Sequence, residues 1–234
     1  MKQINIIVSF YSLIVLIVII ERLSPTTNIL LQPDNFIRLH EIIQTNILLL
    51  LTVILSTFIL KIITKDFSTL KSKWNFYLFL CFLSGVYLYG AGEGWHEIAS
   101  FLFNHYCNTK HIVGNLCGGL FINDYYTGNL IFFIGGLFMN VSLITLAIKQ
   151  PVKQATNKQL TILLLNSVVY AFTWFAYAAF DVVLLGLFFE SLLMIISLGF
   201  FLMIRKDFRA YPYITYSAFA YTAATLATLL VRFH

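Results

Sequence analysis

Acidic and imidazole side chains gather between Gly90 and Cys107, in a chain that is otherwise largely apolar. The segment EGWHE places Glu93 and His96 three residues apart, a spacing that brings two side chains to one face of a helix. Carboxylate-bridged di-iron bundles take two metal ligands from the same Glu-x-x-His spacing. An imidazole and a carboxylate together also suit Zn²⁺. We therefore predict that Glu93 and His96 belong to a metal site.

One helical turn does not complete such a site, and the sequence lacks the usual partners. It has no second Glu-x-x-His, and Ser100 stands where the H-E-x-x-H zinc motif has its second histidine. Glu97 lies about 100° around a helix from His96, so we expect a neighbour rather than a ligand from the same turn. The other ligands must come from elsewhere in the fold. The predicted metal ligands are Glu93, His96, His40 and His105.

The same region carries the predicted catalysis. Glu93, His96 and Asp124 are expected to bind a metal that activates water, or to act as general acid and base. The alternative is structural: these side chains cap the end of a helix at the level of the lipid headgroups, with Trp95 and His96 as interfacial anchors. The spacing alone leaves both interpretations open.

The composition is that of an integral membrane protein. Of the 234 residues, 59% are hydrophobic and only 11% are charged, whereas a soluble domain carries about 25% charged residues. The formal charge of +5 does not indicate a nucleic-acid partner. The basic residues lie between the apolar segments, where they contact lipid headgroups. Membrane lipids are therefore the expected partners, with a small-molecule or lipid ligand.

Apolar segments separated by short polar connections predict an all-α bundle of seven transmembrane helices, in a single integral membrane domain over residues 1–234. The first segment lacks a small-x-small cleavage site, which favours a retained span over a signal peptide. Pro151 and Pro212 fit helix boundaries. The predicted spans are 4–20, 42–63, 75–92, 129–148, 160–180, 183–204 and 212–231.

The distribution of basic residues predicts the orientation of this bundle. With the N-terminus inside, 11 of the 15 lysines and arginines lie inside, as the positive-inside rule requires. The C-terminus is then outside. All five histidines and most acidic residues also fall on the outer side. We expect a bacterial inner membrane or its equivalent.

The longest connection, residues 93–128, lies on this outer side. Its first part, HEIASFLFNHYC, has the apolar spacing of a short amphipathic helix, which either extends the third span or lies in the interface. Its second part, NLCGGLFINDYYTGN, is expected to form a loop that folds back towards the headgroups. Cys107 and Cys117 either form a disulfide in this loop or remain free thiols.

Polar residues inside the predicted spans favour a different function. Glu190 lies within the sixth span, where a lipid-facing acidic side chain would cost at least about 2.5 kcal/mol. It should therefore face the bundle. Asn140 and Tyr221 are further intramembrane polar residues, and Tyr221 belongs to a stripe of hydroxylated residues on the last span. Such a stripe either mediates helix packing or lines a polar path.

Two families of seven-helix membrane proteins are not supported by the residues. Ceramidase-like membrane hydrolases have a Ser-x-x-x-His and, in the last span, a His-x-x-x-His. Here Gly92 stands in place of the serine, and the last span holds no histidine. Microbial rhodopsins need a lysine in the last span, and residues 212–231 contain none.

The sequence thus leaves two functions open. The first is a membrane-embedded enzyme, with or without a divalent metal such as zinc, that acts on a lipid or another amphiphile at the outer side. The second is a transporter or receptor without catalysis, which handles a small molecule or protons by means of Glu190 and the polar stripe.

Overall fold

The computed structural model describes residues 1–33, 35–180 and 184–233, and within these ranges the chain is all-helical apart from one isolated β-bridge between Leu30 and Arg38. The short elements that matter here are α2 (Leu39–Ile42), α5 (Asn115–Ile122) and the π-helical turns η2 (Ile43–Leu48), η4 (Asn123–Gly128) and η5 (Ala176–Phe180). The long helices are α1 (Lys2–Leu23), α3 (Leu49–Ile63), α4 (Lys73–Tyr106), α6 (Asn129–Ala147), α7 (Asn157–Phe175), α8 (Leu184–Ile204) and α9 (Pro212–Phe233).

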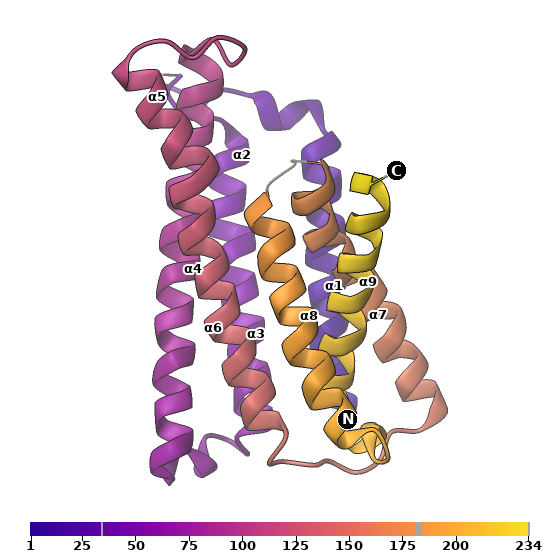
Figure 1. Cartoon of the computed structure of the whole chain (residues 1–234). Helices are drawn as coiled ribbons and strands as arrows, with labels where there is room; N and C mark the ends of the chain where they lie inside the picture. The colour runs from indigo at the N-terminus through magenta and orange to yellow at the C-terminus, as the bar shows by residue number, and fades with distance from the viewer. Residues whose placement is uncertain (34, 181–183, 234) are drawn as a thin grey trace.

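The long helices alternate in direction and pack side by side in one bundle (Figure 1). α4 packs against α6, α9 contacts both α7 and α8, and α1 contacts α3 and α7. Within the described ranges, six helical segments are long and apolar enough to cross a membrane, which is compatible with the predicted multi-pass membrane protein. They are Lys2–Glu21, Leu39–Ile63, Lys73–Tyr106, Asn115–Ala147, Leu184–Ile204 and Pro212–Phe233. α7 is not among these six.

The segment predicted as a long outer connection is mostly helical. α4 runs from Lys73 to Tyr106 without a break, so the third predicted span continues through HEIASFLFNHYC. Residues 115–128, predicted to be a loop, form α5 and η4 and lead directly into α6. Their Gly and Asn residues have low helix propensity, but the packing of both elements against α4 overrides it. His96 therefore lies within a helix and caps no helix end.

Glycines bring α4 and α6 into close contact next to the acidic segment of α4. A Cβ atom added to Gly92 would lie 2.2 Å from the backbone nitrogen of Phe132, and one added to Gly128 would lie 2.7 Å from that of His96. Small residues allow this kind of backbone approach between membrane helices. The contact fixes the height and the rotation of the α4 segment that carries Glu93 and Glu97.

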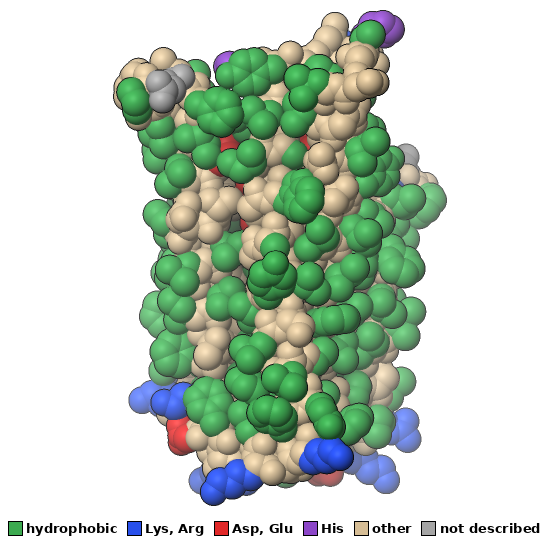
Figure 2. All heavy atoms as spheres, turned by 90° about the vertical axis from the view of Figure 1, so that its left-hand side faces the viewer, with side chains coloured by type: hydrophobic (Ala, Val, Ile, Leu, Met, Phe, Trp, Pro, Cys, Tyr) green, Lys and Arg blue, Asp and Glu red, His purple; other side chains and the backbone are tan. Residues whose placement is uncertain are grey.

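The two ends of the bundle differ in charge. Figure 2 shows Lys and Arg side chains gathered at the lower end, whereas acidic side chains are recessed between apolar ones near the upper end. The lower end comprises the start of α1 and the connections α3–α4, α6–α7 and α8–α9, which together carry the 11 basic residues counted above. Most basic residues and the buried acidic side chains thus lie at opposite ends of the bundle, whereas Asp66 and Asp207 accompany the basic residues and Arg38 accompanies Glu41.

The close contact at Gly92 predicts a sharp difference between two neighbouring glycines of α4. Gly92→Ala should lower the free energy of unfolding by about 1–3 kcal/mol, because the new methyl group has no room against α6. Gly94→Ala is the matched control: nothing lies within 4 Å of its added Cβ, so it should be neutral or slightly stabilising. Thermal unfolding in detergent measures both variants. Equal unfolding temperatures for the two would contradict the close contact.

Candidate functional site

Five carboxyl side chains are buried at the upper end of the bundle. Glu21 comes from the end of α1, Glu41 from α2, Glu93 and Glu97 from α4, and Asp124 from η4. Each is at most 7% exposed. Buried carboxylates are tolerated only with hydrogen-bond or charge partners, so the partners of this group define what it can do.

His40 is held between two of these carboxylates. Its Nδ1 lies 2.6 Å from Glu21 Oε1, and its Nε2 lies 3.4 Å from Glu97 Oε2. Gln44 donates a 3.1 Å hydrogen bond to the other oxygen of Glu21 and fixes that carboxylate in turn. A carboxylate that accepts the proton of one ring nitrogen sets the tautomer and leaves the other nitrogen as a ligand. In this arrangement His40 Nε2 faces the carboxylate of Glu97.

Glu41 is oriented by Arg38, three residues before it. The backbone N–H of Arg38 donates to Glu41 Oε2 at 2.9 Å, and its guanidinium donates to Glu41 Oε1 through both Nε, at 2.8 Å, and Nη2. This local pairing accounts for a carboxylate that is fully buried. It also fixes the orientation of the Glu41 carboxylate, as the hydrogen-bond partners of metal ligands do.

His40, Glu41 and Glu97 converge on one point. Each offers one ligand atom, and these atoms lie within 4.8 Å of one another. One imidazole nitrogen and two carboxylate oxygens suit Zn²⁺ or a similar divalent ion. Three protein ligands leave a fourth position for water or substrate, which is the pattern of catalytic zinc sites.

The predicted site residues are distributed over this end of the bundle. Of the four predicted metal ligands, only His40 belongs to the converging group. His96 Nδ1 lies 3.0 Å from Asp124 Oδ1 and 3.0 Å from its carbonyl oxygen. Glu93 lines a central cavity instead. His105 is exposed and stacks on Phe101, so it lies apart from the group.

The sequence alone did not predict that Glu41, Glu97 and the supporting Glu21 act together with His40. The EGWHE motif drew attention to the face of α4 that carries Glu93 and His96, whereas Glu97 faces α2, about 100° away from His96. The adjacent pair His40 and Glu41 was the available signal. Adjacent residues point in different directions on a helix. His40 and Glu41 can therefore share one site only because α4 brings Glu97 close to both, and no local sequence pattern shows this.

π-helical turns lie directly beside the site. η2 follows His40 and Glu41 on α2, and η4 carries Asp124. Such turns insert an extra residue into a helix and occur frequently at functional sites. Here they let α2 and α5 continue into α3 and α6 while turning polar side chains inward.

A central cavity of about 170 Å³ runs inward from this end. Gln44 and Glu93 line its upper part, and the hydrogen bond from Gln44 to Glu21 connects it to the His40 group. Asn140 and Tyr213 line its lower part, where the Tyr213 hydroxyl donates to Asn140 Oδ1 at 3.2 Å. The remaining walls are largely apolar and aromatic. The cavity can therefore take an apolar chain directly below the converging ligands.

The other predicted intramembrane residues have separate places. Tyr221 is 1% exposed and packs in the apolar core with Trp174 and Phe133, as expected for helix packing. Glu190 faces the bundle and is fully buried beside Thr228 and Arg232 of α9. Asn140 is the member of the predicted set that lines the cavity.

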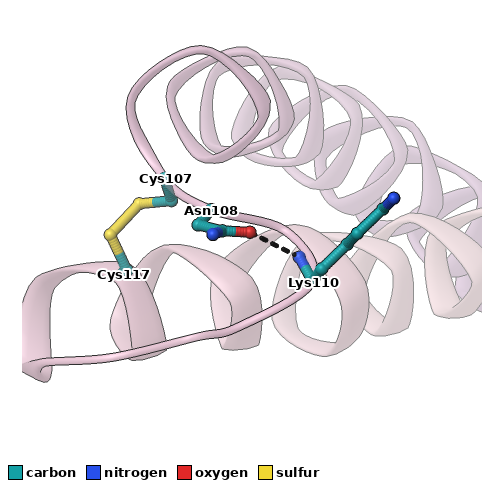
Figure 3. The surroundings of a disulfide bond; sticks show 4 residues. All are labelled: Cys107, Asn108, Lys110 and Cys117. Atoms are coloured by element: carbon teal, nitrogen blue, oxygen red, sulfur yellow. Dashed lines mark hydrogen bonds between the residues drawn. A yellow bond between two sulfur atoms is a disulfide. The ribbon is translucent and has the colours of Figure 1, made fainter.

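Cys107 and Cys117 form a disulfide, with their Cα atoms 5.8 Å apart (Figure 3). It joins the end of α4 to α5 across the reversal at residues 108–114, where the Asn108 side chain accepts a hydrogen bond from the backbone N–H of Lys110. Disulfides persist in oxidising compartments. The bond therefore agrees with an outward-facing upper end.

No protein family, curated protein or solved structure matches this chain. Any statement about its activity must therefore come from the site itself.

Proposed function

We propose that this chain is a membrane-embedded, metal-dependent enzyme that acts on a lipid or another amphiphile at the outer side of the membrane. The metal is held by His40, Glu41 and Glu97. The observation that supports this most strongly is the pair of contacts to His40: Glu21 binds its Nδ1 while its Nε2 faces Glu97. A histidine with a purely structural role needs only a hydrogen-bond partner such as Glu21. Here the carboxylates of Glu97 and Glu41 also lie close to its second ring nitrogen.

The chemistry follows from the open coordination position. A divalent ion at this point polarises a bound water or a substrate carbonyl. Glu93 lies one helical turn below Glu97 on the same face of α4 and lines the cavity. It is placed to take the proton of the attacking water and to return it to the leaving group. The reaction class is hydrolysis of an amphiphile whose polar group lies between the metal and Glu93.

Metal analysis tests this proposal. The protein, purified in detergent and loaded with Zn²⁺, should retain about one ion per chain, given a single group of three ligands. His40→Ala should lose it, and Glu21→Gln should weaken binding by about 10- to 100-fold, because it removes the acceptor that orients His40. Glu93→Gln should keep the metal and lose hydrolysis of lipid esters or amides.

His105→Ala is the matched control and should bind zinc like the wild type, because His105 is exposed and stacked on Phe101. Two results would contradict the proposal. Zinc that persists in His40→Ala but disappears in His96→Ala would place the metal at the Glu93–His96 pair. No retained zinc in any variant or the wild type would remove the metal centre.

We further infer seven spans, with the N-terminus inside and the C-terminus outside. α7 packs between α1 and α9 within the bundle and so completes the alternation of directions. The clustering of 11 basic residues at the lower end supports its assignment to the inner side.

Cysteine labelling tests this orientation. In a Cys81→Ser background, which removes the one free cysteine of the described residues, a membrane-impermeant maleimide added to intact cells should label Lys110→Cys. It should leave Lys65→Cys unlabelled until the membrane is opened, because Lys65 lies in the connection between α3 and α4. The reverse pattern would invert the topology.

A second candidate function rests on Glu190. Both of its carboxyl oxygens are buried without a hydrogen-bond partner among the described residues, and the same holds for Thr228 Oγ1 and Arg232 Nη2. A buried ionisable group of this kind suits a proton path. In the transporter function the Glu190 carboxyl group takes up and releases protons beside the Thr228 hydroxyl, whereas Arg232 stays protonated and acts only through its charge.

Proteoliposomes distinguish this function from the enzyme. Under an imposed membrane potential, the wild type should acidify or alkalinise the lumen, and Glu190→Gln should stop the flux because it cannot release a proton. Thr228→Val is a milder control that keeps the carboxyl group. No flux in the wild type, or equal flux in Glu190→Gln, would remove Glu190 from any transport mechanism.

A further inference from the structure

The central cavity has the shape of a site for one narrow chain. Its lining residues run along α6 from Phe132 to Leu143, which at about 1.5 Å per residue is roughly 16 Å of helix. Its volume of about 170 Å³ is small for that length. A long, narrow, largely apolar cavity accommodates a single extended hydrocarbon chain and excludes a pair of chains.

The upper end of the cavity selects the polar group of such a ligand. The charged side chain in its lining is Glu93, and no lysine or arginine of the described residues lines it. An anionic headgroup would meet a carboxylate there, whereas the N–H of an amide or the free hydroxyls of a monoacylglycerol can donate a hydrogen bond to it. The structure thus favours a neutral headgroup over a fatty-acid carboxylate.

We propose that the cavity binds the acyl chain of a neutral, single-chain lipid ester or amide. This inference rests on the proposed function, since it names the class of amphiphile whose polar group reaches the metal and Glu93. Binding in the cavity itself needs no metal, so the two claims fail separately.

Glycine 136 provides a direct way to fill the cavity. Gly136 lines it, and a Cβ added there would lie 3.8 Å from a ring carbon of Tyr89 and 3.9 Å from one of Trp174, so a side chain fits without displacing the backbone. Gly136→Leu should therefore occupy the space of the ligand chain. Gly199→Leu is the matched control, because Gly199 is exposed on α8 and its added Cβ meets nothing within 4 Å.

The experiment measures quenching of Trp174 by monolaurin that carries bromine on its acyl chain. Trp74→Phe and Trp95→Phe remove the other two tryptophans, which are 57% and 48% exposed, and leave Trp174 in the cavity wall. We expect saturable quenching in this background and with Gly199→Leu, and its loss with Gly136→Leu. Unlabelled monolaurin should reverse the quenching, whereas laurate and dilaurin should not.

Quenching that persists in Gly136→Leu would contradict binding in the cavity. Reversal by laurate and dilaurin as well as by monolaurin would contradict a preference for a neutral single-chain lipid.

The same measurement on zinc-free wild type separates this inference from the proposed function. Quenching should be unchanged without zinc, since none of His40, Glu41 and Glu97 lines the cavity. If zinc-loaded wild type shows no quenching, the proposed class of lipid is wrong and the proposed metal site is unaffected. Quenching that is intact in a protein without retained zinc supports the chain site and overturns the enzyme.

Discussion

The burial of five carboxyl groups at one end of an apolar bundle is the constraint on which the rest of the structure depends. An ionised carboxylate taken out of water needs charge or hydrogen-bond partners, and this chain supplies them in pairs. Arg38 binds Glu41, Gln44 and His40 bind Glu21, and His96 faces Asp124. These pairings orient the carboxylates towards defined points, and one such point is shared by His40, Glu41 and Glu97.

The fold holds this arrangement through backbone contacts rather than through side-chain packing alone. Gly92 and Gly128 bring α4 and α6 close enough to fix the acidic segment of α4. The disulfide between Cys107 and Cys117 ties the top of α4 to α5, which continues through η4 into α6. The α2–η2 segment then meets α4 from the other side. The two parts of the chain that carry the proposed metal ligands are thus positioned by two independent constraints.

The sequence allowed the class of fold to be predicted well, because a low charge content and long apolar runs follow directly from the bilayer. It also indicated which end carries the acidic and imidazole groups. The loop expected at 115–128 became helix because contacts with α4 outweigh the low helix propensity of Gly and Asn. Local sequence patterns could not predict the group formed by His40, Glu41 and Glu97. It depends on the rotation of α4 relative to α2, which the distant glycine contact with α6 determines.

The most direct test of the metal centre is X-ray absorption spectroscopy at the zinc edge of the loaded protein. The account predicts a first shell made only of nitrogen and oxygen at about 2.0–2.2 Å, with the multiple-scattering signature of a single imidazole. That signature should vanish in His40→Ala. A shell containing sulfur, two or more imidazoles, or an imidazole signal unchanged in His40→Ala would contradict the assignment of His40, Glu41 and Glu97 as the ligands.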